Sequence, residues 1–219
     1  WLDTGAHTRF AWNPDNTLKQ LVNVLPNNSV LTQHDYTYDG VGNRQTHTET
    51  IAGTTTPYKY LYDEVNRLTE VRNNSTNALI EANTYDPLNN RTSKTDGVNT
   101  AYYLYDAANQ LKEMRQGSPT GTLTAGLVYD QNGSLTKKCE GGAVTTSPTD
   151  CTGATTTALS YDALNRMTQA AKTGISTQTY GYDDQDRRIR KTIGAATTTN
   201  YIYSGPDIHA EYTTWTSPT

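Results

Sequence analysis

Phenylalanine, methionine and cysteine are scarce in this chain of 219 residues, which holds one Phe, two Met and two Cys. It contains no apolar run of about 18 residues, so we expect no membrane span in this segment. It also lacks the phosphate-binding Gly-x-x-x-x-Gly-Lys, the zinc-protease His-Glu-x-x-His and the Gly-x-Ser-x-Gly turn of serine hydrolases. Its four histidines are scattered singly, and we expect each to be structural; they are His7, His34, His47 and His209. The sequence therefore predicts no catalytic residue, no cofactor and no metal ligand.

Positive charge is also limited, because 18 Lys and Arg are set against 22 Asp and Glu, which gives a net charge of −4. Domains that bind nucleic acid usually carry a basic stripe, so we do not expect nucleic acid as a partner. The one basic cluster, Arg187–Lys191, follows Asp183, Asp184 and Asp186. We interpret it as a strand that forms ion pairs with its neighbours.

The sequence does contain a motif that occurs nine times: an aromatic residue, usually Tyr, then usually Asp, two variable residues, and Gly, Asn or Asp. Successive copies are roughly 20 to 32 residues apart, a spacing that indicates a repeat architecture. We expect a single array of about nine repeats over residues 1–219, whose function belongs to a surface and not to one site. The copies begin at Trp12, Tyr38, Tyr62, Tyr85, Tyr105, Tyr129, Tyr161, Tyr182 and Tyr203.

The fifth motif position holds only residue types that tolerate a left-handed backbone. Its occupants are Asn16, Gly42, Asn66, Asn89, Asn109, Gly133, Asn165, Asp186 and Asp207. Asp at the second position suits the start of a type I turn, where its carboxylate accepts a hydrogen bond from the backbone two residues on. A type I turn followed by a left-handed residue connects β-hairpins. The predicted structural turn pairs are Asp39 and Gly42, Asp63 and Asn66, Asp86 and Asn89, Asp106 and Asn109, Asp130 and Gly133, Asp162 and Asn165, and Asp183 and Asp186.

The residues that flank the turns predict strands. Aromatic residues alternate before the turns, as in Tyr36/Tyr38, Tyr60/Tyr62, Tyr103/Tyr105, Tyr180/Tyr182 and Tyr201/Tyr203. Spacing by two places each pair on one face of a strand. After the turn comes either an apolar residue (Leu18, Leu68, Leu111, Leu135, Met167) or an arginine (Arg44, Arg91, Arg188). One hairpin per repeat gives roughly sixteen to eighteen strands and an all-β fold.

The tyrosine content, sixteen Tyr against one Phe, indicates aromatic faces that are partly wet or lie over polar neighbours. The repeated aspartates all occupy one turn position, so a structural demand explains them. We therefore expect no pair of carboxylates for glycoside hydrolysis among them.

The two cysteines, Cys139 and Cys151, lie in the longest gap between motifs, from Tyr129 to Tyr161. A loop inserted at 139–151 and closed by a disulfide explains both the length and the cysteines, and it indicates an oxidising compartment. Two free thiols, or half of a metal site, are the alternatives. Zinc requires four ligands at close spacing, and no histidine lies near in sequence.

The motif Tyr38-Asp39-Gly40-Val41-Gly42-Asn43-Arg44 resembles the YD repeats of the RHS (rearrangement hot spot) proteins. That family includes bacterial polymorphic toxins, the C components of insecticidal toxin complexes and the teneurins. The resemblance extends from about Phe10 to Tyr212 and implies a continuous curved or spiralling antiparallel sheet, part of a hollow shell. The copy at Tyr203 departs from the pattern, because Ser204 replaces the Asp and Pro206 is disfavoured at its place in a type I turn. The self-cleaving core of the family is not among these residues, so no autoproteolytic role is assigned.

The resemblance implies a non-enzymatic shell segment that encapsulates a C-terminal toxin or other cargo. Its expected partners are neighbouring YD repeats, the RHS core of the same parent chain and the cargo, in a secreted or cell-surface bacterial protein. An extracellular adhesion module that contacts glycans or a protein is the alternative, and an enzyme is a third. The chain starts without Met, and we interpret it as a fragment that would associate edge to edge without its neighbours.

We predict that Cys139 and Cys151 are bonded to each other. A thiol reagent should then find no free thiol in the denatured, unreduced protein. Replacing both by serine should lower the free energy of unfolding by about 2–3 kcal/mol, because the bond restricts the unfolded chain. Two thiols that titrate before reduction would contradict the pairing.

Overall fold

The computed structural model describes residues 5–141, 154–195 and 197–215, which form eighteen β-strands. Within these ranges no helix is long and apolar enough to cross a membrane. The chain divides into two compact units, residues 1–101 and 102–219. The predicted all-β fold, with sixteen to eighteen strands, is confirmed.

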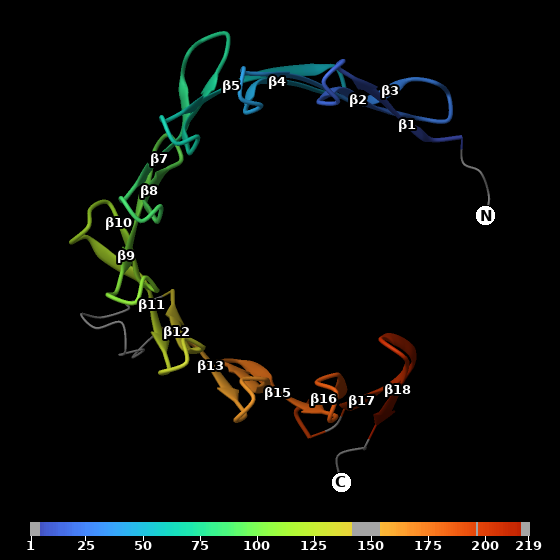
Figure 1. Ribbon diagram of the computed structural model, residues 1–219, viewed down its shortest axis with the longest axis vertical. Coiled ribbons are helices and arrows are strands. Elements are labelled where there is room, and N and C mark those ends of the chain that lie inside the picture. The colour runs from blue at the N-terminus through green and yellow to red at the C-terminus, as the bar shows by residue number, and fades with distance from the viewer. Residues whose placement is uncertain (1–4, 142–153, 196, 216–219) are drawn as a thin grey trace. The chain divides into compact units, whose positions relative to one another are not determined.

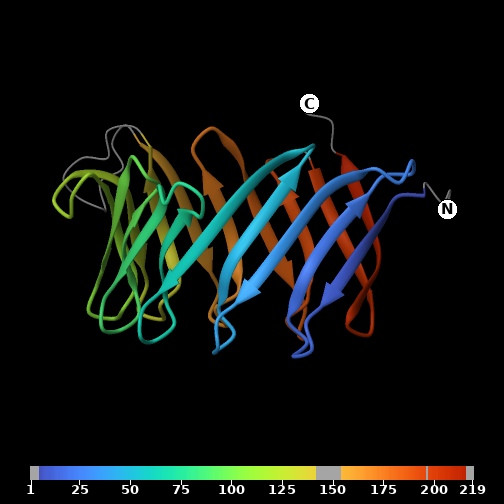
Figure 2. The ribbon, with the colours of Figure 1, turned by 90° about the horizontal axis from the view of Figure 1, so that it is seen from above.

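In the first unit, strands β1 to β8 pair antiparallel, each with the next along the chain. Figure 2 shows the first five of them side by side, in blue to cyan. The strands are β1 (His7–Trp12), β2 (Leu18–Val24), β3 (Val30–Tyr38), β4 (Arg44–Ile51), β5 (Thr54–Tyr62), β6 (Leu68–Asn73), β7 (Leu79–Tyr85) and β8 (Arg91–Thr95). Strand β9 (Thr100–Tyr105) contains the boundary between the units.

The second unit follows the same order, with β9 paired to β10 and every later strand paired to the next up to β18. The strands are β10 (Leu111–Gln116), β11 (Thr122–Tyr129), β12 (Leu135–Glu140), β13 (Thr155–Tyr161), β14 (Met167–Lys172), β15 (Ile175–Tyr182), β16 (Arg188–Ile193), β17 (Thr197–Ser204) and β18 (Asp207–Trp215).

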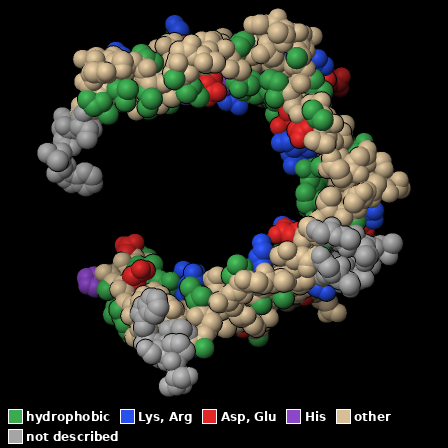
Figure 3. Space-filling view, turned by 180° about the vertical axis from the view of Figure 1, so that it is seen from behind, with side chains coloured by type: hydrophobic (Ala, Val, Ile, Leu, Met, Phe, Trp, Pro, Cys, Tyr) green, Lys and Arg blue, Asp and Glu red, His purple; other side chains and the backbone are tan. Residues whose placement is uncertain are grey.

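Each unit is a single layer of strands (Figure 1). Of the described hydrophobic residues, the buried ones are Val22 and Val24 in the first unit and Leu123, Ala125 and Cys139 in the second. Acidic and basic side chains lie next to one another along the face that Figure 3 shows. Because so few side chains are buried, the stability of each unit depends on its strand ladders and cross-strand side-chain pairs more than on a packed core.

Each of the nine motifs connects the two strands of one hairpin, as the sequence predicts. In the copy at Tyr62, the backbone N–H of Asn66 donates to Asp63 O and that of Asp63 donates to Arg67 O, both at 3.0 Å. The Asp63 carboxylate accepts the N–H groups of Val65 and Arg67 at 3.1 and 2.9 Å. One aspartate therefore satisfies two backbone donors of a tight turn.

The backbone at the fifth motif position is left-handed in eight of the nine copies, with φ between 61° and 92°. The prediction that most of the nine copies have a left-handed residue at this position is confirmed, and Asp207 is the exception. There Ser204 pairs directly with Asp207, and the turn consists of Gly205 and Pro206, with φ of 63° at Gly205. Proline fixes a negative φ, so this shorter turn places its one left-handed residue at Gly205.

Cys139 is fully buried and belongs to a small cluster with Leu123, against which Ala154 packs. Cys151 and most of the segment 139–151 lie outside the described residues. The pairing of Cys139 with Cys151 stays a prediction.

We predict that Asn66→Val lowers the free energy of unfolding by about 1 kcal/mol or more, because a β-branched residue fits poorly at a φ of 64°. Asn66→Gly is the matched control. It keeps the backbone freedom and loses only the hydrogen bond that Asn66 Oδ1 accepts from Asn43 Nδ2 at 2.9 Å. Urea unfolding of the two variants measures the difference, and an equal loss in both would remove backbone strain as the cause.

Candidate functional site

The motif tyrosines donate their hydroxyls backward, to the hairpin before their own. Tyr85 Oη donates to the carbonyl of Leu68 at 2.9 Å, and Tyr161 Oη donates to that of Leu135 at 3.0 Å. The acceptor is always the first residue of the strand that follows the preceding turn. The same bond joins Tyr38 to Leu18, Tyr62 to Arg44, Tyr129 to Leu111, Tyr182 to Met167 and Tyr203 to Arg188.

These carbonyls need a side-chain donor because the strand ladders end before reaching them. Between β6 and β7 the last pair is Glu70 with Ala82, which leaves Leu68 beyond the ladder. The hydroxyl of Tyr85 satisfies the carbonyl there. Phenylalanine has no donor for this role, and this accounts for Tyr in place of Phe at the seven motif positions that make the bond.

All seven predicted turn aspartates bind the backbone of their own turn. Each accepts the N–H groups of the residues two and four positions on, at 2.8 to 3.1 Å. The N–H of Arg67, followed by its guanidinium, holds the pKa of Asp63 below its usual 3.8. The same partners from Arg166 hold the pKa of Asp162 below that value. Both carboxylates are therefore charged at neutral pH.

The arginine that directly follows the fifth motif position connects its turn to the next one. Arg67 Nε donates to Asp63 Oδ2 at 2.7 Å, while Arg67 Nη1 donates to Asp86 O at 3.0 Å and Asn89 Oδ1 at 2.9 Å. The guanidinium also lies 4.8 Å from the centre of the Tyr85 ring. One side chain thus fixes the spacing of two hairpins.

Two further arginines make the corresponding contacts in the second unit. With Arg67 they are called here the turn-linking arginines. Arg166 binds Asp162, Asp183 O, Asp186 and the Tyr182 ring, and Arg187 binds Asp183, Gly205 O and the Tyr203 ring. Within the basic cluster Arg187–Lys191, the ion pair of Arg187 therefore lies inside its own turn.

A second set of arginines starts the strand after the turn and lies over the tyrosines that precede the motif. The guanidinium of Arg44 is 4.3 Å from the Tyr60 ring centre and 5.9 Å from that of Tyr36. Burial raises the pKa of Tyr60, so its ring presents a neutral, partly dehydrated surface to the cation. Arg188 lies in the same way near Tyr180 and Tyr201, at 5.6 and 5.1 Å.

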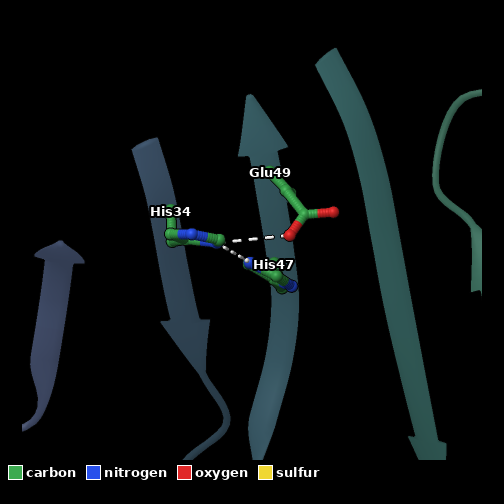
Figure 4. A group of neighbouring side chains, drawn as sticks. All are labelled: His34, His47 and Glu49. Atoms are coloured by element: carbon green, nitrogen blue, oxygen red, sulfur yellow. Dashed lines mark hydrogen bonds and ion pairs between the residues drawn. The ribbon is translucent and has the colours of Figure 1, made fainter. Parts of the chain in front are cut away.

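Two histidines and a glutamate meet on the hairpin of β3 and β4 (Figure 4). His34 pairs with Glu49 and His47 pairs with Tyr36 in the strand register. His34 Nδ1 lies 3.1 Å from His47 Nε2 and 3.6 Å from Glu49 Oε1. The ring of His47 stacks on Tyr36 at 4.8 Å and on Tyr58 at 5.6 Å between centres. His34, His47 and Glu49 together are called the histidine cluster.

The sequence prediction treated these histidines as isolated, and that interpretation is wrong for His34 and His47. The signal was present, because a hairpin that turns at 39–43 brings residue 34 opposite 49 and residue 36 opposite 47. Spacing by two then puts all four on one face. Burial, followed by the charge of Arg44, lowers the pKa of His47 below its usual 6.5, so this ring is neutral at pH 7.

We predict that Tyr85→Phe lowers the free energy of unfolding by about 0.5–1.5 kcal/mol, the usual net value of one hydrogen bond. The ring under Arg67 is retained, so only the bond to the Leu68 carbonyl is lost. Tyr212→Phe is the matched control, since Tyr212 is 52% exposed. Equal stability of Tyr85→Phe and the unaltered chain in urea would remove the hydroxyl bond as a stabilising contact.

Comparison with known proteins gives one family and a set of solved structures. A comparison with curated proteins found no match. The structure of TcdB2-TccC3 without its hypervariable C-terminal region is 15% identical, with a TM-score of 0.43, over 93% of this chain and 14% of that one. The Tc holotoxin pore of Photorhabdus luminescens is 16% identical, with a TM-score of 0.34, over 90% and 14%. The chain thus spans about 14% of the length of these structures.

A porin-like protein from Bacteroides uniformis is also similar, at 11% identity and a TM-score of 0.27, over 94% of this chain and 92% of that one. The sequence model of the Teneurin YD-shell family matches residues 16–219, which include the second to ninth motifs. The resemblance to YD repeats is confirmed, and the chain belongs to the Teneurin YD-shell family.

Proposed function

We propose that this chain is a non-enzymatic wall segment of a YD shell, and that the shell encloses a toxin or other cargo carried by the same parent polypeptide. One observation carries the proposal: the repeated polar side chains of the motif join hairpins to one another. The aspartate binds its own turn, the tyrosine binds the preceding hairpin and the turn-linking arginines bind the following turn. Repeats that each contact only the neighbouring repeats form an extended surface.

The outer strands support the proposed partners. Among the residues that the structure describes, β1 has its ladder with β2 and β18 has its ladder with β17. An unpaired strand edge is a template for another strand. We propose that neighbouring YD repeats and the RHS core of the parent chain continue the wall there, and that residues 1–219 act as one array of about nine repeats.

We also propose that the chain has no catalytic activity and that the protein is extracellular. The seven turn aspartates, which would be the natural acids of a hydrolase, already accept backbone N–H groups, and this favours a structural role. We place the protein outside the cell, secreted or on the surface of a bacterium, because the predicted disulfide would form in an oxidising compartment.

Protection from protease tests the enclosure. The polypeptide encoded by the complete gene should keep a segment outside residues 1–219 intact during digestion under native conditions. Asn66→Val together with Asn165→Val should speed its cleavage, because both turns then open more often. Asn66→Gly with Asn165→Gly is the matched control and should keep most of the protection.

If protease cuts every segment outside residues 1–219 as fast under native conditions as in urea, the proposal that the shell encloses a cargo is wrong. Saturable glycan or protein binding without any protected segment would favour the adhesion module instead. Hydrolysis of a glycan or peptide by the purified chain, abolished by one Asp or His substitution, would overturn the non-enzymatic assignment.

A further inference from the structure

We propose that the histidine cluster binds one transition-metal ion of the zinc class. Its ligands are Nδ1 of His34, Nε2 of His47 and a carboxylate oxygen of Glu49. The cluster lies on one face of the first unit, on the adjacent strands β3 and β4 (Figure 4).

The spacing of the ligand atoms fits such an ion. Zinc binds histidine and carboxylate at about 2.0–2.2 Å in a tetrahedron, so its ligand atoms are about 3.3–3.6 Å apart. In the cluster, His34 Nδ1 is 3.1 Å from His47 Nε2 and 3.6 Å from Glu49 Oε1. All three ligand atoms lie within 4.8 Å of one another. Small side-chain rotations complete one face of a tetrahedron.

The strands and rings hold the ligands in place before any ion arrives. His34 and Glu49 are directly opposite each other in the register, and His47, opposite Tyr36, lies two pairs further along the ladder. The His47 ring stacks between those of Tyr36 and Tyr58, which limits its rotation. Ligands that are already ordered lose little conformational entropy on binding.

The donor set selects the ion. Two imidazoles with one carboxylate suit zinc and related metals, whereas calcium and magnesium prefer oxygen ligands alone. Three protein ligands leave a fourth position for water or for a donor group of another molecule. The His34 and Glu49 side chains are 19% and 28% exposed, so an ion can reach them.

Binding exchanges a hydrogen bond for two metal–nitrogen bonds. The 3.1 Å contact requires an N–H on one of the two facing nitrogens. A metal requires a lone pair on both, so that proton moves to the other nitrogen of its own ring. No charge is lost, and the Glu49 carboxylate offsets part of the charge of the ion. Arg44, which lies over Tyr36, opposes the ion, while Asp35 on β3 favours it.

Zinc titration of the unreduced 219-residue chain, stripped of metal with a chelator, tests the site by calorimetry. One zinc ion per chain should bind, and millimolar magnesium should not compete. His34→Gln and His47→Gln should each weaken binding at least about tenfold, since losing even a partner behind a ligand costs about that much. His7→Gln and His209→Gln are matched controls and should bind as the unaltered chain does.

Zinc-edge X-ray absorption of the unaltered chain keeps the test independent of variant folding. Nitrogen and oxygen neighbours at about 2.0–2.1 Å with an imidazole signature would support the site. Sulfur neighbours at about 2.3 Å would place the ion at the cysteines and overturn it. It is also overturned if no zinc binds, or if His7→Gln or His209→Gln weakens binding as much as the cluster variants do.

Discussion

The bond from each motif tyrosine to the preceding hairpin is the contact on which the rest of this structure depends. A turn that contains a left-handed residue shifts the strand register beside it, and the ladder to the neighbouring hairpin stops before the first carbonyl of the new strand. Tyr85 closes that gap at Leu68, as Tyr62 does at Arg44. Without these hydroxyls, the ends of a single-layer sheet would leave polar backbone groups dependent on water.

Variation around this contact adjusts how firmly neighbouring turns are joined. Arg67 connects two turns with a charged side chain that makes three hydrogen bonds and covers a tyrosine ring. At the equivalent place Asn43 reaches Asn66, and Ser134 reaches Asn165, through one hydrogen bond each. Charged, multiply bonded side chains hold geometry better than single neutral bonds, so stiffness can differ along the array while the fold is unchanged.

Two hairpins depart from the repeat pattern. The turn at Gly205 and Pro206 replaces the aspartate turn and shortens the hairpin. The histidine cluster places two imidazoles on one hairpin, on the face shared with Tyr36 and Tyr58. A repeat protein gains a local site by altering one unit, since its neighbours preserve the scaffold.

The sequence by itself determined the repeat, the hairpin turns and the all-β class. The turns depend on the motif Asp and on a residue that tolerates a left-handed backbone, and the strands depend on aromatic residues spaced by two. Each of these signals lies within a short segment of the chain. It also marked the exception at Ser204 and Pro206, though not that Gly205 would take the left-handed place. Only the tertiary structure decided which carbonyl each tyrosine binds and which turns Arg67 and Arg166 connect. These contacts join residues from different strands, and their partners depend on register and twist, which the spacing of residues within one strand does not specify.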